Sequence, residues 1–180
     1  MKITSKTLAL TAVMTALCAV ATYVVAIPFP SGVGYFNLGD VIVLLAGWLL
    51  GPVWGGLAAA LGSMLADFLA GYAVYAPATF VIKGLVAAAG WGLYTVLKKA
   101  IRKDGIDFLP RLLSGLIAEC IMVLGYLLYE AVVLGYGAAA LASVLGNGLQ
   151  AVCGCIGAVA LMAAMYPVPA VRRLFPAVSK

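Results

Sequence analysis

The sequence predicts an all-α integral membrane protein: a bundle of six transmembrane helices with cytoplasmic N- and C-termini, and one transmembrane domain over residues 1–180. Three observations predict it. Hydrophobic residues make up 66% of the chain and charged residues 9%, whereas a typical soluble domain has roughly 25% charged residues. The apolar residues form runs long enough to cross a bilayer. The basic residues flank these runs, as they do in helices anchored at a cytoplasmic surface.

The first apolar run, residues 7–27, contains no charged residue. At a helical rise of about 1.5 Å per residue it covers the roughly 30 Å of the hydrocarbon core. Lys2 and Lys6 before it also resemble the start of a signal peptide, but the run is long enough to remain as a span. Residues 28–39, with their prolines and glycines, are expected to form an ordered loop.

The second apolar run, residues 41–66, is interrupted by Gly51-Pro52, which is a helix stop signal. Hydropathy leaves open whether this run makes one span or two. Residues 40–50 would cover only about 17 Å as a helix. This element is therefore expected to be tilted, extended by its flanks, or a re-entrant half-helix.

Charge parity favours two crossings in that region. Three later apolar runs are expected to span, at residues 77–97, 111–134 and 141–165. The basic connector at 98–110 and both termini all face the cytoplasm under the positive-inside rule, so an even number of crossings must separate each pair. That requires two crossings between Asp40 and Ala70, and a re-entrant hairpin would preserve the parity.

The same composition argues against several function classes. The formal charge of +5 lies at membrane edges, so nucleic acid is not an expected partner. The chain has no histidine, which is the usual general base and metal ligand, so neither an enzyme nor a metal or cofactor site is expected. There is no GxxxxGK[ST] loop for nucleotide hydrolysis. The four cysteines lie in apolar runs and are interpreted as packing residues.

Ionisable groups within apolar runs are costly, so those that remain indicate function. The chain keeps five of them: Asp40, Asp67, Lys83, Glu119 and Glu130. Counted from the outer helix ends, Asp67, Lys83 and Glu130 lie within about 10 Å of the outer surface. Asn147 and Gln150 share one helix face at depths of about 9 and 14 Å. These side chains predict a polar pocket open to the outside.

Structural interpretations of the same residues stay open. Asp40, Asp67 and Lys83 either contribute to a pocket or form an ion-pair network, and Asp40 can instead cap a helix start. Asn147 and Gln150 either bind a ligand or hold helices together.

The fifth predicted helix places Glu119, Tyr126 and Glu130 on one inward face, because they are spaced by seven and four residues. Glu119 is either a buried structural carboxyl or a proton-coupling group. Tyr72 and Tyr75 either cover an aromatic ligand or belong to an interfacial aromatic belt.

On the first predicted helix, Ala12 and Ala16 form an AxxxA pair. Such a pair permits close contact with another helix of this chain or of a partner.

Several runs also carry a family likeness: YFNLGD at 35–40, AD at 66–67, GYAVYAP at 71–77, KG at 83–84 and GNGLQ at 146–150. Together they resemble the substrate-binding S components of energy-coupling factor (ECF) transporters, in the branch of riboflavin, pyridoxine and hydroxymethylpyrimidine carriers. The resemblance implies six helices that bind a vitamin near the outer surface. It also implies that the AxxxA face docks onto a transmembrane coupling (T) subunit driven by two ATPase subunits.

The resemblance and the depth of the polar groups lead to one set of candidate binding residues: Asn37, Asp40, Asp67, Tyr75, Lys83, Tyr126, Glu130, Asn147 and Gln150. We expect a non-catalytic binding subunit of an ATP-driven importer, surrounded by lipid in a bacterial inner or plasma membrane. The expected ligand is a pyridoxine- or hydroxymethylpyrimidine-like heterocycle, with riboflavin next. The alternatives are a stand-alone proton-coupled secondary transporter and a structural membrane subunit.

Overall fold

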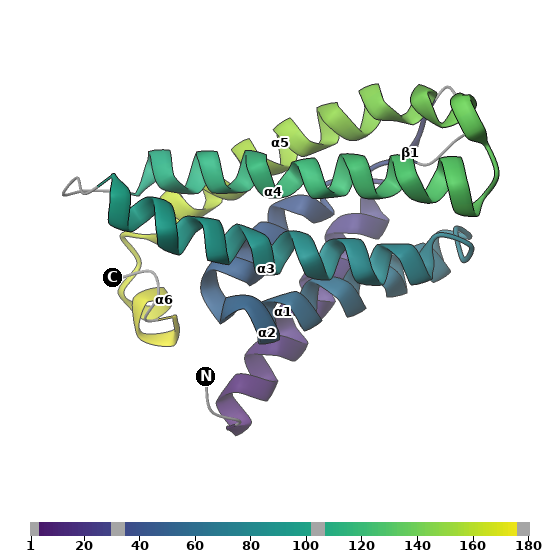
Figure 1. Ribbon diagram of the computed structural model, residues 1–180. Helices are drawn as coiled ribbons and strands as arrows, with labels where there is room; N and C mark the ends of the chain where they lie inside the picture. The colour runs from purple at the N-terminus through teal and green to yellow at the C-terminus, as the bar shows by residue number, and fades with distance from the viewer. Residues whose placement is uncertain (1–3, 30–34, 102–106, 176–180) are drawn as a thin grey trace.

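The computed structural model describes residues 4–29, 35–101 and 107–175, and most of them are helical (Figure 1). The long helices are α1 (Ser5–Val24), α2 (Gly39–Leu69), α3 (Ala76–Ala100), α4 (Phe108–Leu128) and α5 (Leu141–Met165). The short elements are the π-helical turn η1 (Tyr129–Val133), the 3-10 turn η2 (Gly137–Ala140), the helix α6 (Pro169–Leu174) and the antiparallel strand pair β1 (Ile27–Pro28) and β2 (Tyr35–Phe36). Five helical stretches in the described residues are long and apolar enough to cross a membrane. The predicted all-α membrane bundle is therefore confirmed.

The helix α2 contains the predicted break. Gly51 has φ 84° and ψ −178°, outside the helical region, and Pro52 follows it. This positive φ is open to glycine and unfavourable for other residues. A Cβ atom on Gly55 would overlap the backbone carbonyl of Ala46, so the chain turns sharply at Gly51 and the two arms pack against each other. These arms, residues 39–50 and 52–69, lie where charge parity predicted two crossings, whereas by length and composition residues 39–69 count as one of the five candidate spans.

The helix α2 lies at the centre of the molecule. It packs against α1, α3 and α5, while α4 packs against α3 and α5. The side chains of Leu44, Trp48, Val86 and Met122 are buried between these helices. The outer surface carries exposed apolar side chains on every long helix, which is the surface expected of a bundle surrounded by lipid.

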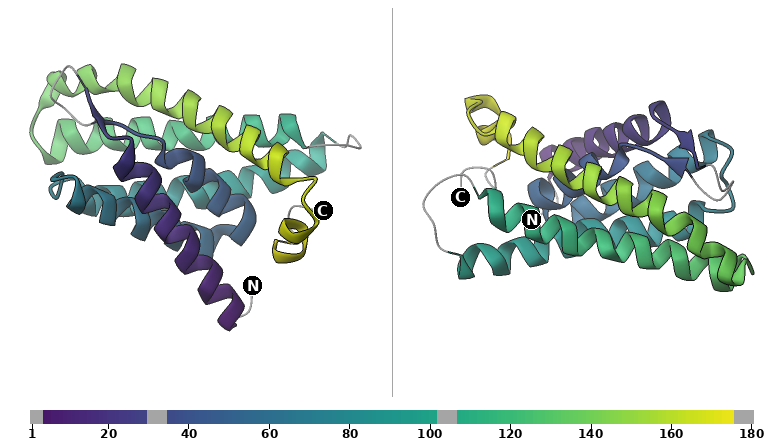
Figure 2. Two further views of the ribbon diagram at one scale, coloured as in Figure 1. Left: turned by 180° about the vertical axis from the view of Figure 1, so that it is seen from behind. Right: turned by 90° about the horizontal axis from the view of Figure 1, so that it is seen from above.

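The two ends of the bundle differ. Figure 2 shows that β1, β2, the start of α3 and the η1–η2 turn lie together at one end. The start of α1, the end of α3, the start of α4 and α6 lie toward the other end. The positive-inside rule assigns this second end to the cytoplasm, and that orientation stays a prediction.

Close helix contacts depend on residues without side chains. Gly47 of α2 lies against the backbone of Ala87 in α3, where an added Cβ would overlap the carbonyl oxygen. Gly62 of the second α2 arm lies against α1 in the same way, with Cys18 Cβ only 2.5 Å from the position of an added Cβ. Membrane helices pack closely at such small residues, because the backbones can approach each other.

The contact at Gly62 predicts a stability difference between two glycine variants. Gly62→Ala is expected to destabilise the protein by about 1–3 kcal/mol through overpacking against α1. The matched control is Gly92→Ala in α3, where no atom lies within 4 Å of the added Cβ. This control is expected to melt at the same temperature or slightly higher, because alanine favours a helix over glycine by about 0.5–1 kcal/mol. Thermal unfolding in detergent measures both, and equal melting temperatures would contradict the close contact.

Candidate functional site

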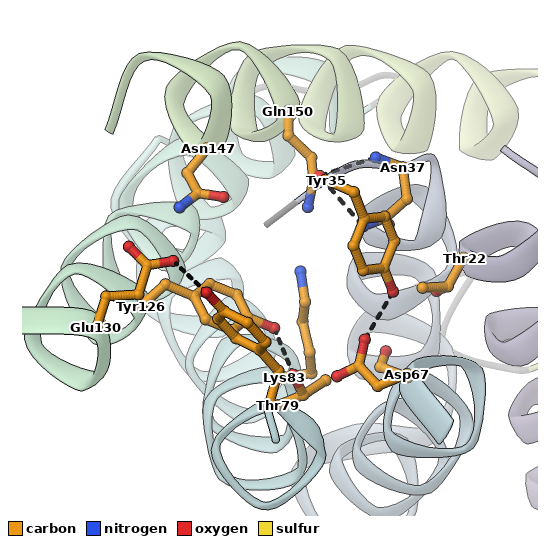
Figure 3. Close-up of a pocket in the computed structure, with 12 residues that line it drawn as sticks. Thr22, Tyr35, Asn37, Asp67, Thr79, Lys83, Tyr126, Glu130, Asn147 and Gln150 are labelled. Carbon is orange, nitrogen blue, oxygen red and sulfur yellow. Dashed lines mark hydrogen bonds between the residues drawn. The ribbon is translucent and has the colours of Figure 1, made fainter. Parts of the chain in front are cut away.

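A polar cavity opens at the β1–β2 end of the bundle, with a volume of about 410 Å³ including its mouth. Figure 3 shows side chains from α1, the β2–α2 segment, α2, α3, α4, η1 and α5 pointing toward this space. The lining residues are Thr22, Tyr35, Asn37, Ser63, Asp67, Tyr75, Thr79, Lys83, Tyr126, Glu130, Asn147 and Gln150. Every residue in the predicted candidate set except Asp40 lines this one cavity. Polar groups that are distant in the sequence therefore meet at one end of the bundle.

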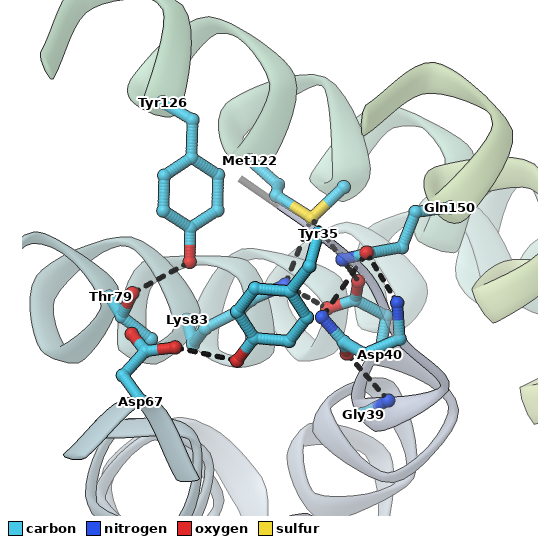
Figure 4. Close-up of polar contacts among 10 residues, drawn as sticks. Tyr35, Gly39, Asp40, Asp67, Thr79, Lys83, Met122, Tyr126 and Gln150 are labelled. Carbon is cyan, nitrogen blue, oxygen red and sulfur yellow. Dashed lines mark hydrogen bonds and ion pairs between the residues drawn. The ribbon is translucent and has the colours of Figure 1, made fainter. Parts of the chain in front are cut away.

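Asp40 lies beneath the cavity rather than in its wall. It is fully buried, and its Oδ1 forms an ion pair with Lys83 Nζ. Its Oδ2 accepts a hydrogen bond of 2.6 Å from Gln150 Nε2 (Figure 4). The sequence left open whether Asp40 joins a pocket, an ion-pair network or a helix cap, and the structure places it in an ion pair, covered by its partners. An uncompensated buried charge is costly, so Lys83 and Asp40 stabilise each other as a pair.

Asn37, rather than Asp40, caps the start of α2. Its Oδ1 accepts a hydrogen bond of 2.8 Å from the Gly39 backbone N–H. Its own backbone N–H and its Nδ2 both donate to Gln150 Oε1, at 2.9 and 3.2 Å. Gln150 therefore joins the segment before α2 to α5 with its oxygen and joins Asp40 to α5 with its nitrogen.

One wall of the cavity contains polar atoms without partners. Tyr35 Oη donates a hydrogen bond of 2.6 Å to Asp67 Oδ1, whereas Asp67 Oδ2 is buried and makes no hydrogen bond of normal geometry, with the Thr79 hydroxyl as its neighbour. The hydroxyl oxygens of Thr22 and Ser63 are also buried without a partner, and both residues line the same cavity. Buried polar groups are nearly always hydrogen-bonded, so a cluster of exceptions in a cavity indicates a place for a ligand.

The opposite wall is formed around Glu130 in the π-helical turn η1. Ser143 Oγ donates a hydrogen bond of 2.5 Å to Glu130 Oε2, and Tyr75 Oη lies 3.4 Å from Oε1. Asn147 Nδ2 lies 3.5 Å from Ser143 Oγ. Single π-helical turns are common at functional sites, because they change the direction of a side chain within a helix.

Three tyrosine rings line the cavity, those of Tyr35, Tyr75 and Tyr126. The ring centroids of Tyr75 and Tyr126 are 6.3 Å apart, and the ring of Tyr72, which is not part of the lining, packs on Tyr35 at 4.6 Å. Burial and the nearby Asp67 carboxylate raise the pKa of Tyr35. Burial and Glu130 likewise raise the pKa of Tyr75. Both hydroxyls therefore stay protonated at neutral pH and donate to the carboxylates.

The predicted inward face of Glu119, Tyr126 and Glu130 is partly a cavity wall. Tyr126 and Glu130 line the cavity, and the Tyr126 hydroxyl lies 2.9 Å from Thr79 Oγ1. Glu119 lies below it, fully buried, and neither carboxyl oxygen has a hydrogen-bond partner. Within the described residues there is no cluster of three His, Cys, Asp or Glu side chains that could hold a metal ion.

Sequence reasoning missed several lining residues, namely Thr22, Tyr35, Ser63 and Thr79. Hydroxyl side chains are inexpensive in membrane helices because they bond to their own backbone, as Thr11 Oγ1 does to the Thr7 carbonyl at 2.8 Å. They therefore do not stand out as the charged residues do. The signal available for Thr22 was its place on the buried face of α1 with Thr7, Thr11 and Cys18.

Comparisons with known proteins agree with this architecture. The chain is 38% identical over 138 residues to a protein of Pyrococcus woesei described as "Uncharacterized protein in gap 3'region", in a match that covers 76% of this chain and 86% of that protein. A family model described as "ECF-type riboflavin transporter, S component" matches residues 2–167, which include α1 to α5 and the whole cavity lining. The chain therefore belongs to the ECF-type riboflavin transporter S component family and is a multi-pass, substrate-binding membrane subunit of a vitamin transporter, not an enzyme.

Proposed function

We propose that this subunit binds a small vitamin-type aromatic heterocycle in the cavity at the β1–β2 end of the bundle. The observation that carries the proposal is the cluster of unpartnered buried atoms, Thr22 Oγ1, Ser63 Oγ and Asp67 Oδ2, in one cavity wall. A ligand that donates hydrogen bonds to these atoms removes their desolvation cost. The tyrosine rings of the lining supply flat apolar surfaces for an aromatic ring.

The charges of the cavity favour a ligand with hydrogen-bond donors. Lys83 is paired with Asp40, so its charge is already compensated. Asp67 and Glu130 are acceptors within the lining. Hydroxymethyl groups, amino groups and ring N–H groups are the complementary donors, and pyridoxine- and hydroxymethylpyrimidine-like rings carry such groups.

The restricted space in the cavity supports a compact ligand. The volume of about 410 Å³ counts the open mouth, so the enclosed part is smaller. Riboflavin, which the family description names, is the second candidate. Its ring system and ribityl chain together have more than twice as many non-hydrogen atoms as pyridoxine.

The exposed face of α1 supports a docking role in the same transporter. Ala12 and Ala16 are both exposed, and the neighbouring Val13 and Leu17 are exposed apolar side chains. We propose that this face contacts the transmembrane coupling subunit, and that two ATPase subunits drive release of the ligand. Under this proposal the cavity faces outward and the termini are cytoplasmic, in the plasma membrane of a bacterium.

Glu119 favours a second candidate function, a proton-coupled carrier that needs no ATPase. Its carboxyl group is fully buried and lacks hydrogen-bond partners, as a proton-binding group in a pump would be. Uptake by vesicles that contain this chain alone separates the two functions. We expect no uptake without the ATPase subunits, and concentrative uptake by the chain alone would favour the carrier.

Two variants of the unpartnered wall test the ligand site. Asp67→Asn is expected to raise the Kd for the ligand about ten- to a hundredfold, because it replaces the charged carboxylate acceptor with a neutral amide of similar size. Ser63→Ala is expected to raise it about three- to tenfold. Isothermal titration of the purified chain with pyridoxine, hydroxymethylpyrimidine and riboflavin measures these values and also ranks the ligands.

The matched control for Ser63→Ala is Ser114→Ala. Ser114 is equally buried, but its hydroxyl donates to the Arg111 carbonyl at 3.0 Å and it does not line the cavity. We expect Ser114→Ala to bind the ligand as the parent protein does. Equal loss of affinity in both serine variants would mean a general effect on folding. Unchanged affinity in both Ser63→Ala and Asp67→Asn would show that this wall does not bind the ligand.

Docking through α1 predicts a separation of binding from transport. Ala12→Trp places a large side chain on the exposed face, so ligand binding by the purified chain should be unchanged while uptake by the complete transporter falls at least about tenfold. Val96→Trp on the lipid-facing side of α3, where Val96 is 65% exposed, is the control and should retain uptake. Equal loss of binding and uptake in Ala12→Trp would place this face in the core or in the ligand site.

A further inference from the structure

A second polar cluster lies at the end of the bundle opposite the cavity, where α3 ends and α4 begins. Arg111 is at its centre and is only 5% exposed. Its guanidinium carbon lies 4.2 Å from the centroid of the Tyr94 ring and 5.5 Å from that of the Trp48 ring. Its Nη2 donates a hydrogen bond of 3.0 Å to Tyr94 Oη. The guanidinium group is therefore held in position by two aromatic rings.

Arg111 has no anionic partner among the described residues. Its Nη1 is buried and makes no hydrogen bond. Asp107 is the nearby carboxylate, but its Oδ2 accepts hydrogen bonds from Lys98 Nζ and, at 2.5 Å, from Tyr94 Oη. The two ion pairs found in the described chain are Lys83–Asp40 and Lys98–Asp107, and neither includes Arg111.

The negative charge of Asp107 does not balance the positive charges of both Lys98 and Arg111. Partial burial on its own raises the pKa of Asp107, but the hydrogen bonds from Lys98 and Tyr94 and the nearby positive charges outweigh it and lower the pKa. Asp107 is therefore ionised at neutral pH and balances one of the two cations. Lys98, Asp107 and Arg111 together keep one unbalanced positive charge.

A cavity lies directly beside this guanidinium, and its space of about 330 Å³ includes open solvent. Arg111 and Asp107 form its polar side, and Phe108, Val159, Met162 and Tyr166 form its apolar side. It shares no lining residue with the cavity at the β1–β2 end. The first turn of α4 also lies here, and the N–H groups at the start of a helix favour an anion.

We infer that this second cavity binds the phosphate group of an anionic phospholipid. The unpartnered Nη1 supplies a charge-assisted donor to a phosphate oxygen, and arginine is well suited to phosphate recognition. The apolar side chains suit the glycerol and acyl part of a lipid better than a free ion. Basic pockets between membrane helices at the cytoplasmic side are known to bind lipid headgroups.

The surroundings of the cavity support a lipid rather than a soluble anion. Lys98 lies in the last turn of α3, and Arg172 lies over the Tyr166 ring at 5.9 Å. Phe108 and Leu109 at the start of α4 are about half exposed, at 54% and 47%. Positive charge next to exposed apolar side chains is the combination found at the headgroup level of a membrane.

Native mass spectrometry tests this site on the full chain in an uncharged detergent. The probes are short-chain phosphatidylglycerol, short-chain phosphatidylcholine and inorganic phosphate. We expect phosphatidylglycerol to bind with the highest affinity. Arg111→Gln keeps a donor near Tyr94 but removes the charge, and it should weaken phosphatidylglycerol binding at least about tenfold. Lys99→Gln removes the same charge from an exposed position outside the cavity, and it should change the affinity less than about twofold.

A second variant tests the same inference in the opposite direction. Asp107→Asn removes the carboxylate beside the site and is expected to tighten phosphatidylglycerol binding about two- to fivefold. Asp107 lies at the edge of the cluster, with a side chain 16% exposed, so this variant remains informative if Arg111→Gln does not fold.

Three outcomes would overturn the inference. The first is wild-type lipid binding by a folded Arg111→Gln protein, and the second is unchanged or weaker binding by Asp107→Asn. The third is inorganic phosphate binding as tightly as phosphatidylglycerol, which would assign the site to a soluble anion. A failure of this site leaves the vitamin-binding cavity untouched, because the two have no residue in common.

Discussion

The ion pair between Lys83 and Asp40 fixes the relative positions of the helices around the cavity at the β1–β2 end. It joins the start of α2 to the first third of α3, and Gln150 adds α5 through its hydrogen bond to the same carboxylate. In hydrocarbon neither charge has water as an alternative partner, so separating these elements costs far more than the loss of an exposed salt bridge. The floor of the cavity is therefore held together by side chains of the chain itself.

The walls above this floor differ from it in how fully their polar atoms are hydrogen-bonded. Around Asp67, Ser63 and Thr22 the protein buries polar atoms and leaves them without partners. A folded protein retains such groups at a cost, which a suitable ligand removes on binding. Glu130, by contrast, is already held by Ser143 and Tyr75. One wall thus contributes a fixed acceptor and the other a set of unfilled hydrogen-bonding positions, and under the proposed function this difference would select ligands by the placement of their donors.

The general architecture could be predicted because the bilayer permits few solutions. Uninterrupted apolar runs had to be helices, and costly polar residues such as Lys83 and Asn147 had to face one another. The Gly51-Pro52 break was also predictable from residue type, although the sharpness of the turn follows from the contact between Gly55 and Ala46, which no local pattern reveals. Residue type and depth carry no information about rotation around a helix axis, so the sequence did not separate Asp40 in the floor from Asn147 in the wall. Ser63 and Thr22 were not predictable as site residues, because a hydroxyl that bonds to its own helix looks the same in sequence as one that does not.

Gln150 limits which substitutions can change the ligand preference of this fold. Its amide oxygen is occupied by Asn37 and its amide nitrogen by Asp40, so a single side chain requires both a donor half and an acceptor half. Replacing Gln150 by glutamate would place a second carboxylate against Asp40. Replacing it by leucine would remove the hydrogen bonds to both Asn37 and Asp40. Ser63, Asp67 and Asn147 line the cavity but take no part in these hydrogen bonds of Gln150, so under the proposed function they are the positions at which ligand preference would change. A designer who wishes to redirect this carrier to a new nutrient should hold residue 150 constant and vary the rim around it.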